Sequence, residues 1–145
     1  MLESVFAPVQ DWGLFILRLG LGIIFPFHAW LKANPRGPAG GVRGFSGWLA
    51  QMRVPLPGFL GWVVVLLESV GAVLLILGLG TRILAFGFAI EMLVAIVLVK
   101  RGMAKKRFME PDGTGWEFEF ALMMAALALV FAGPGSIALD RVIGL

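Results

Sequence analysis

Residues 58–99 read GFLGWVVVLLESVGAVLLILGLGTRILAFGFAIEMLVAIVLV, two apolar runs that only a short glycine-rich turn separates. Each run is about as long as the roughly 20 residues that cross a bilayer as an α-helix. The turn at residues 78–81 is so short that the two helices must be antiparallel neighbours. This segment therefore predicts two adjacent membrane-spanning helices, at about 58–79 and 82–99.

Two further apolar runs, at about 13–32 and 116–132, predict two more spans. Between the first two spans, apolar residues recur at helical spacing and predict a short helix at the membrane interface: Phe45, Trp48, Leu49 and Met52. The chain is 59% hydrophobic and 14% charged, so little is left for a soluble core. We expect residues 1–145 to form a single domain, an all-α membrane protein built as an antiparallel bundle of four transmembrane helices.

The composition excludes several kinds of site. Because the chain has no cysteine, it cannot form disulfides, thiolate metal sites or c-type haem attachments. His28 is the single histidine, so one copy of the chain cannot build a bis-histidine haem or multi-histidine metal site. No metal is expected. The net charge of +3 does not indicate a nucleic-acid partner, because the basic residues flank the predicted spans.

The basic residues predict the topology. Nine of them lie in or beside the loops at 33–57 and 100–115, against three on the other side: Arg18, Arg82 and Arg141. Cytoplasmic loops carry an excess of lysine and arginine. Both loops are therefore predicted to be cytoplasmic in a plasma-membrane protein, with both termini outside. No cleavable signal peptide is expected, because no basic region precedes the first apolar run.

Ionisable residues inside spans are costly, at roughly 2.5–3.5 kcal/mol each, and usually mark functional sites. Counting depth along the helices predicts an intramembrane ion-pair network of Arg18, Glu68 and Arg82 in the outer half. An equally strong reading is that these pairs only fix helix register. Glu91 lies mid-span and could join Glu68, pair across an oligomer interface or be protonated.

In the inner half, His28 and Lys32 are predicted to face Glu117 and, less directly, Glu119. His28, Lys32 and Glu117 are the candidates for binding a substrate or quinone, or for relaying protons. The alternatives are a hydrogen-bonding role for His28 and a snorkelling position for Lys32. Glu119 is the weaker candidate, since it could face lipid headgroups. No catalytic residue is assigned.

Three motifs together resemble those of the DoxX family. Residues 17–32, LRLGLGIIFPFHAWLK, are similar to the family pattern LRxxxGxxFxxHGxxK. Residues 68–72 (ESVGA) with 77–82 (LGLGTR) are similar to ExxGGxxLxxGLxTR. Trp116-Glu117 with residues 133–140 (GPGSIALD) is similar to the closing pattern GPGRxSLD. Four positions depart from the patterns, and the loss of the last motif's arginine bears on any anion contact there: Ala29, Ala72, Ser136 and Ala138.

The resemblance implies a four-helix membrane protein that is tied to redox metabolism. One branch of the family is the membrane subunit of thiosulfate:quinone oxidoreductase, and other members are partners of oxidative-stress proteins. By position, the resemblance implies a functional core of six residues: Arg18, His28, Lys32, Glu68, Arg82 and Glu117.

The leading functional hypothesis is an accessory subunit of a membrane redox system that binds a quinone. No redox centre is identifiable within the chain, so electrons would come from a soluble partner protein or a bound cofactor. If the chain is part of an enzyme, that enzyme is a quinone-linked oxidoreductase. One alternative is a non-enzymatic scaffold or assembly factor that recruits a soluble partner. Another is transport of a small solute or proton, which would require a homo-oligomer.

Overall fold

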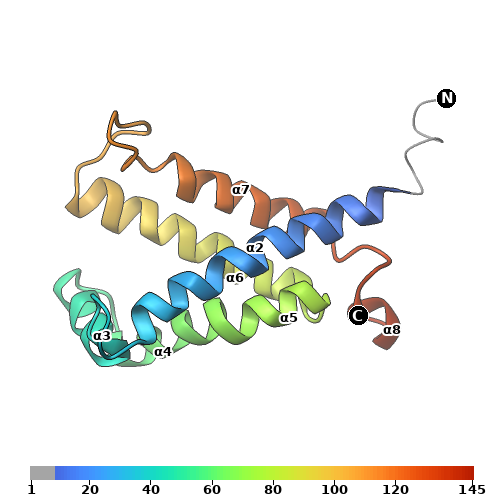
Figure 1. Ribbon diagram of the computed structural model, residues 1–145, viewed down its shortest axis with the longest axis horizontal. Helices are drawn as coiled ribbons and strands as arrows, with labels where there is room; N and C mark the ends of the chain where they lie inside the picture. The colour runs from blue at the N-terminus through green and yellow to red at the C-terminus, as the bar shows by residue number, and fades with distance from the viewer. Residues whose placement is uncertain (1–8) are drawn as a thin grey trace.

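The computed structural model describes residues 9–145, so the predicted position of the N-terminus lies outside the described residues. Within that range the chain forms helices and connecting loops only. Figure 1 shows their arrangement. In chain order they are α2 (Gln10–Ala33), α3 (Gly41–Gln51), α4 (Pro57–Leu66), the π-helical segment η2 (Leu67–Gly71), α5 (Ala72–Leu77), α6 (Thr81–Val94), the π-helical segment η3 (Ala95–Met103), α7 (Glu117–Ala132) and α8 (Leu139–Ile143).

Three continuous helices are long and apolar enough to cross a membrane: Gln10–Ala33, Pro57–Leu77 and Thr81–Met103. They correspond to the first three predicted spans. The fourth predicted span corresponds to α7, which is apolar but has only 16 residues. Large apolar side chains cover the outside of the molecule, among them Phe27, Ile83 and Phe131, which are 71%, 80% and 79% exposed. The prediction of an all-α membrane protein is therefore confirmed.

The molecule has two distinct ends (Figure 1). At the α3 end lie α3, the start of α4, the end of α2 and the loop 104–116. At the α8 end lie the α5–α6 turn, the end of α7 and α8. Between the ends, α2 packs on α5 and η2, while α6 packs along α7. All these helices share one apolar core, in which the rings of Phe25 and Phe88 stack with centroids 4.0 Å apart.

The amphipathic segment predicted between the first two spans is the helix α3. Its apolar residues Phe45 and Leu49 are buried, and it packs against α4. The contact is close because Gly61 of α4 lies directly against Ser46 of α3. The helix ends at Gln51, shortly before Pro55 and Pro57, which cannot continue it.

The α5–α6 turn depends on glycine. Gly78 follows the last residue of α5 with φ of 71°, a left-handed conformation that glycine adopts without strain. Its N–H donates to the carbonyl of Leu75 at 3.1 Å, which satisfies one of the helix's terminal acceptors. A Cβ at Gly78 would collide with the Arg18 guanidinium and lie 2.5 Å from the Cβ of Ala138. The tight turn therefore also allows three distant segments to meet.

Gly78→Ala should lower the free energy of unfolding by about 2 kcal/mol, from left-handed strain plus overpacking. Gly80→Ala is the matched control. Gly80 has φ of 66°, but nothing lies within 4 Å of its added Cβ, so only the backbone strain of about 1 kcal/mol applies. Thermal unfolding in detergent, followed by tryptophan fluorescence, measures both. Equal losses would show that the close approach of Arg18 and Ala138 contributes nothing.

Candidate functional site

A cavity of about 110 Å³ lies among four helices on the α3 side of the core. That volume is several times the roughly 30 Å³ that one water molecule occupies in the liquid. Four of its lining residues are ionisable carboxylates or cations, and one more is the histidine. The lining consists of Phe25, His28, Lys32, Glu68, Glu91, Met92, Ala95, Phe118, Glu119 and Leu122. The cavity therefore joins an apolar core to a concentrated set of charges.

One ammonium group faces two carboxylates at the floor of the cavity. The Lys32 Nζ lies 2.5 Å from the Oε1 of Glu68 and 3.6 Å from the Oε1 of Glu91. The side chain of Glu68 is 1% exposed and that of Glu91 is 11% exposed. The ammonium also lies 5.5 Å from the ring centroid of Phe45, which fixes its direction. The close pairing matters because an isolated buried charge is strongly destabilising.

Glu68 is positioned by an unusual turn of backbone. It lies in η2, where the helix widens into π-helical geometry between α4 and α5. The hydroxyl of Ser69 donates to the carbonyl of Val65 at 2.6 Å within the same turn. Such π-helical insertions rotate the following residues relative to a regular α-helix and are frequent at functional sites. Here the insertion contains the carboxylate that binds Lys32.

The carboxylates retain hydrogen-bonding capacity inside the cavity. Within residues 9–145, the buried Oε2 atoms of Glu68, Glu91 and Glu119 have no hydrogen-bond partner. Buried side-chain oxygens are paired in the large majority of cases, because leaving one unpaired costs about 1–3 kcal/mol. All three of these residues line the cavity. They are therefore suited to receive hydrogen bonds from a bound molecule.

The cavity opens sideways, between α2 and α7. Its two exposed lining residues are His28 and Phe118, whose rings lie 6.4 Å apart and nearly parallel. Figure 1 shows that α2 and α7 diverge towards the α3 end. His28 lies five residues before Ala33, or about 7–8 Å along the helix axis. Because Phe118 is only the second residue of α7, the opening lies on the side of the helical region close to its α3 end.

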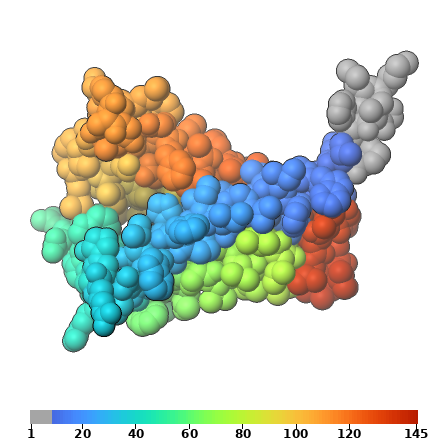
Figure 2. Space-filling view, in the orientation of Figure 1, coloured from blue at the N-terminus to red at the C-terminus, as the bar shows by residue number. Residues whose placement is uncertain are grey.

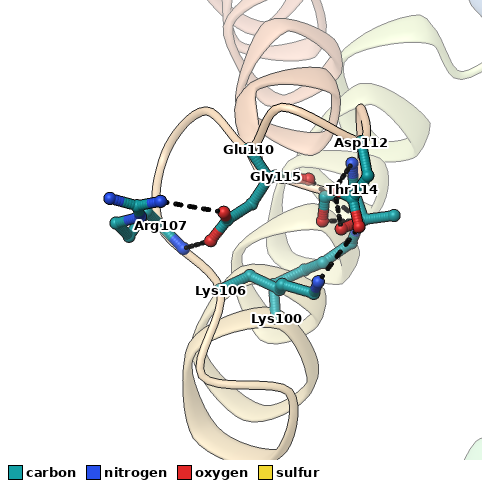
Figure 3. Close-up of polar contacts among 7 residues, drawn as sticks. All are labelled: Lys100, Lys106, Arg107, Glu110, Asp112, Thr114 and Gly115. Carbon is teal, nitrogen blue, oxygen red and sulfur yellow. Dashed lines mark hydrogen bonds and ion pairs between the residues drawn. The ribbon is translucent and has the colours of Figure 1, made fainter.

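Glu119 is held from outside the cavity by Lys100. The Lys100 Nζ lies 3.2 Å from the Oε1 of Glu119 and donates to the carbonyls of Gly115 at 2.9 Å and Thr114 at 3.2 Å. These contacts attach the end of η3 to the start of α7. Figure 3 shows Lys100 reaching the loop at this point.

The loop itself is folded by local polar contacts (Figure 3). The Arg107 N–H donates to Glu110 at 2.9 Å, and hydrogen bonds from the Arg107 backbone and side chain lower the pKa of Glu110. The hydroxyl and N–H of Thr114 donate to Asp112 and lower the pKa of that carboxyl in the same way. The loop therefore gives Lys100 fixed carbonyl partners.

The predicted grouping of His28, Lys32 and Glu117 is only partly formed. His28 and Lys32 line the same cavity, but Glu117 does not. The Glu117 backbone N–H donates to the carbonyl of Phe108 at 3.1 Å, and its carboxylate lies against Gly115 in the loop. Glu119 lines the cavity in its place. Residues two apart on a helix point in different directions, so the two carboxylates cannot share one face.

The predicted ion-pair network of Arg18, Glu68 and Arg82 was wrong in its partners. Arg18 is fully buried and donates to the carbonyls of Ile76, at 3.0 Å, and Ile137. Arg82 donates to the carbonyls of Phe131, at 3.1 Å, and Val130. Ile76, Val130 and Phe131 lie in the last turns of α5 and α7, where four carbonyls lack intrahelical partners, whereas Ile137 lies in the segment between α7 and α8. Glu68 lies further towards the α3 end, where it pairs with Lys32.

The sequence reasoning missed Asp140, which is 4% exposed. Its carboxylate accepts hydrogen bonds from the backbone N–H groups of Gly80 at 2.6 Å and Thr81 at 2.9 Å, and so caps α6. Burial raises the pKa of Asp140, but the bonds from Thr81 and Gly80 outweigh it and hold the pKa below its ordinary value. One signal in the sequence could have indicated this role. The residue before α6 is Gly80, which has no side chain to cap the helix, so the cap must come from elsewhere in the chain.

These features define an all-α membrane protein with a buried lysine–carboxylate cluster beneath a laterally open cavity. Comparison with known proteins gives the same class. The DoxX family profile matches residues 13–101, which include Arg18, Lys32, Glu68 and Glu91. A Bacillus subtilis (strain 168) protein named "Putative oxidoreductase CatD" is 34% identical over 128 residues, covering 88% of this chain and 84% of that protein. No solved structure matches. The chain belongs to the DoxX family.

Proposed function

We propose that the chain is a quinone-binding accessory subunit of a membrane redox system. The observation that carries this proposal is the laterally open cavity whose floor is the Lys32–Glu68–Glu91 cluster. Hydrophobic redox carriers reach proteins from within the bilayer, and a side opening between α2 and α7 suits that route. The name of the Bacillus subtilis relative, which calls it an oxidoreductase, also supports a redox role.

The residues suit the chemistry of a quinone. Each quinone carbonyl accepts a hydrogen bond, and reduction to the quinol consumes two electrons and two protons. Lys32 and His28 can donate to a carbonyl, while Glu68, Glu91 and Glu119 can hold or pass protons. The two electrons are supplied by a redox partner, a soluble protein or its cofactor, which makes the chain an accessory subunit.

The proposed membrane arrangement has four spans in an antiparallel bundle in the plasma membrane, with α7 as the fourth. Its 16 residues extend about 24 Å, somewhat less than the roughly 30 Å hydrocarbon thickness. Support comes from α7 packing along α6, which is itself part of a long apolar helix. The loops at 33–57 and 100–115 lie together at the α3 end and carry most of the basic residues, which supports the proposal that this end faces the cytoplasm.

Binding of a benzoquinone that carries one isoprene unit tests the proposal. In detergent, the wild type should be stabilised against heat by this short-chain quinone, and the concentration dependence gives Kd. His28→Leu should raise Kd up to about tenfold, because one hydrogen bond of about 1 kcal/mol and the shape of the entrance are lost. Phe27→Leu is the matched control, since Phe27 is the adjacent, exposed residue and does not line the cavity.

The outcomes separate the functional alternatives. Binding that weakens in His28→Leu and is unchanged in Phe27→Leu supports a quinone site at the cavity. Equal effects of the two variants would place any binding outside it. If the wild type does not bind the short-chain quinone, the proposed function fails, and the scaffold hypothesis becomes the leading one.

A further inference from the structure

An apolar groove lies beside the cavity, between the same two helices that frame the cavity's entrance. The groove has a volume of about 380 Å³ and lies between α2 and α7. Small residues form much of its surface: Gly13 and Gly20 of α2, with Ala121 and Ala125 of α7. Leu122 lines both the groove and the cavity, so the two spaces share a wall. The groove is therefore adjacent to the candidate site.

The two spaces follow one another along α2. The groove extends from Gly13 to Ile24, about 16 Å along the helix axis, and the cavity begins at Phe25 and reaches Lys32. Figure 2 shows α2 and α7 exposed side by side on this face. Together they form one track that is apolar towards the α8 end and charged towards the α3 end. Such a track fits an amphipathic molecule that lies along the membrane normal.

We propose that the groove binds the prenyl tail of the quinone whose ring occupies the cavity. This inference rests on the proposed function and adds the part of the molecule that selects the ligand class. It assigns Gly13, Gly20, Ala121 and Ala125 to the tail, and the Lys32–Glu68–Glu91 cluster to the ring.

The charges of the cavity argue for a neutral headgroup. Glu68, Glu91 and Glu119 line it; Lys100 pairs with Glu119 from outside the cavity, which leaves Glu68 and Glu91 to share the ammonium of Lys32. A phosphate would meet this excess of negative charge in a buried space, where repulsion between like charges is strong. The volume of about 110 Å³ is also small for a phospholipid headgroup with its counter-charge. A neutral-headed isoprenoid lipid therefore fits better than a phospholipid.

The buried acceptors support the same ligand. Glu68 is 1% exposed, and its Oε2 is among the cavity oxygens that lack a hydrogen-bond partner within residues 9–145. A quinol hydroxyl is a neutral donor that can satisfy such an oxygen. A phospholipid phosphate has no donor to offer, and neither has the oxidised quinone, so this contact belongs to the quinol form. The cavity therefore favours a quinol headgroup, and the apolar groove favours a prenyl tail on the same molecule.

Filling the groove tests the inference. Nothing lies within 4 Å of a Cβ added at Gly20, so Gly20→Leu should fold and occupy the groove with its side chain. Gly47→Leu is the matched control, because Gly47 is also helical and equally open but belongs to α3. Each protein is placed in phosphatidylcholine–phosphatidylglycerol nanodiscs with a polyprenyl benzoquinone. Bound quinone and phospholipid are then quantified by mass spectrometry after purification, and the short-chain Kd is measured in parallel.

We expect Gly20→Leu to reduce bound polyprenyl quinone about tenfold relative to both wild type and Gly47→Leu. A tenfold reduction corresponds to the loss of about two buried methylene groups of the tail from the groove. The short-chain Kd should be unchanged. Three outcomes would overturn the tail assignment while leaving a quinone site intact. Gly20→Leu could weaken binding of the short-chain quinone equally, it could weaken binding of neither quinone, or it could reduce bound phospholipid in place of bound quinone. A wild type that binds no short-chain quinone would instead overturn the proposed function itself.

Discussion

Lys32→Gln should lower the free energy of unfolding by about 3–5 kcal/mol, the usual cost of removing one partner from a buried ion pair. The ammonium is shared by Glu68 and Glu91, at 2.5 Å and 3.6 Å. Without it, two carboxylates whose side chains are 1% and 11% exposed face each other with no cation between them. Denaturation in detergent micelles, followed by tryptophan fluorescence, measures the loss.

Two other variants isolate the role of charge. Glu91→Gln should be close to neutral, because it removes the carboxylate that lies farther from the ammonium and so corrects the local excess of negative charge. Combined with Lys32→Gln, it should recover part of the lost stability. Lys100→Gln is the matched lysine control; it breaks the more exposed pair with Glu119 and should cost only about 1 kcal/mol. If Glu91→Gln destabilises as much as Lys32→Gln, packing rather than charge dominates the cluster.

Asp140→Ala should cost about 3 kcal/mol at neutral pH. The substitution leaves the N–H groups of Gly80 and Thr81 without their acceptor, at about 1–3 kcal/mol for a buried unpaired group. It also removes the negative charge near the fully buried Arg18. Asp112→Ala is the control, because Asp112 is an exposed loop residue and its loss should change stability by less than about 1 kcal/mol. Thermal unfolding of the three proteins in one detergent gives the comparison.

The stabilisation from Asp140 should also depend on pH. Its pKa is lower in the folded chain than in the unfolded chain. The contribution is therefore fully present above the unfolded value of about 3.9 and is lost as the pH falls through the folded value. Wild type and Asp140→Ala should accordingly differ most at neutral pH and converge in strong acid. A difference that stays constant with pH would show that the carboxylate charge is unimportant.

Hydropathy along the chain was sufficient to predict the long helices, because burial in lipid depends on local composition. The turn at Gly78–Gly80 was equally predictable, since its length allows one arrangement. The boundaries were less accurate. The third apolar helix continues through η3 to Met103, beyond the predicted end at Val99, because π-helical geometry carries it past Lys100 and Arg101. The π-helical segments themselves leave no composition signal.

The site could be predicted only in part. His28 and Lys32 were identified as neighbours because they lie one helical turn apart on an apolar helix. Their carboxylate partners were misplaced, because the depth of Glu68 depends on helix tilt and on the π-helical turn of η2. The partners of Arg18 and Arg82 could not be found among side chains at all. They are backbone carbonyls, which every residue has, and only the folded chain shows which ones remain unpaired.

The binding of Arg18 has a consequence for how the chain enters the membrane during synthesis. Its acceptors at Ile76 and Ile137 lie 58 and 119 residues further along the sequence. When the first helix leaves the ribosome, neither acceptor has been made, and an arginine within a span costs roughly 2.5–3.5 kcal/mol. The first helix is thus stabilised in the bilayer stepwise, first by the end of α5 and then by the last residues of the chain. Packing of the C-terminal segment against Arg18 is therefore the event that completes the integration of the N-terminal helix.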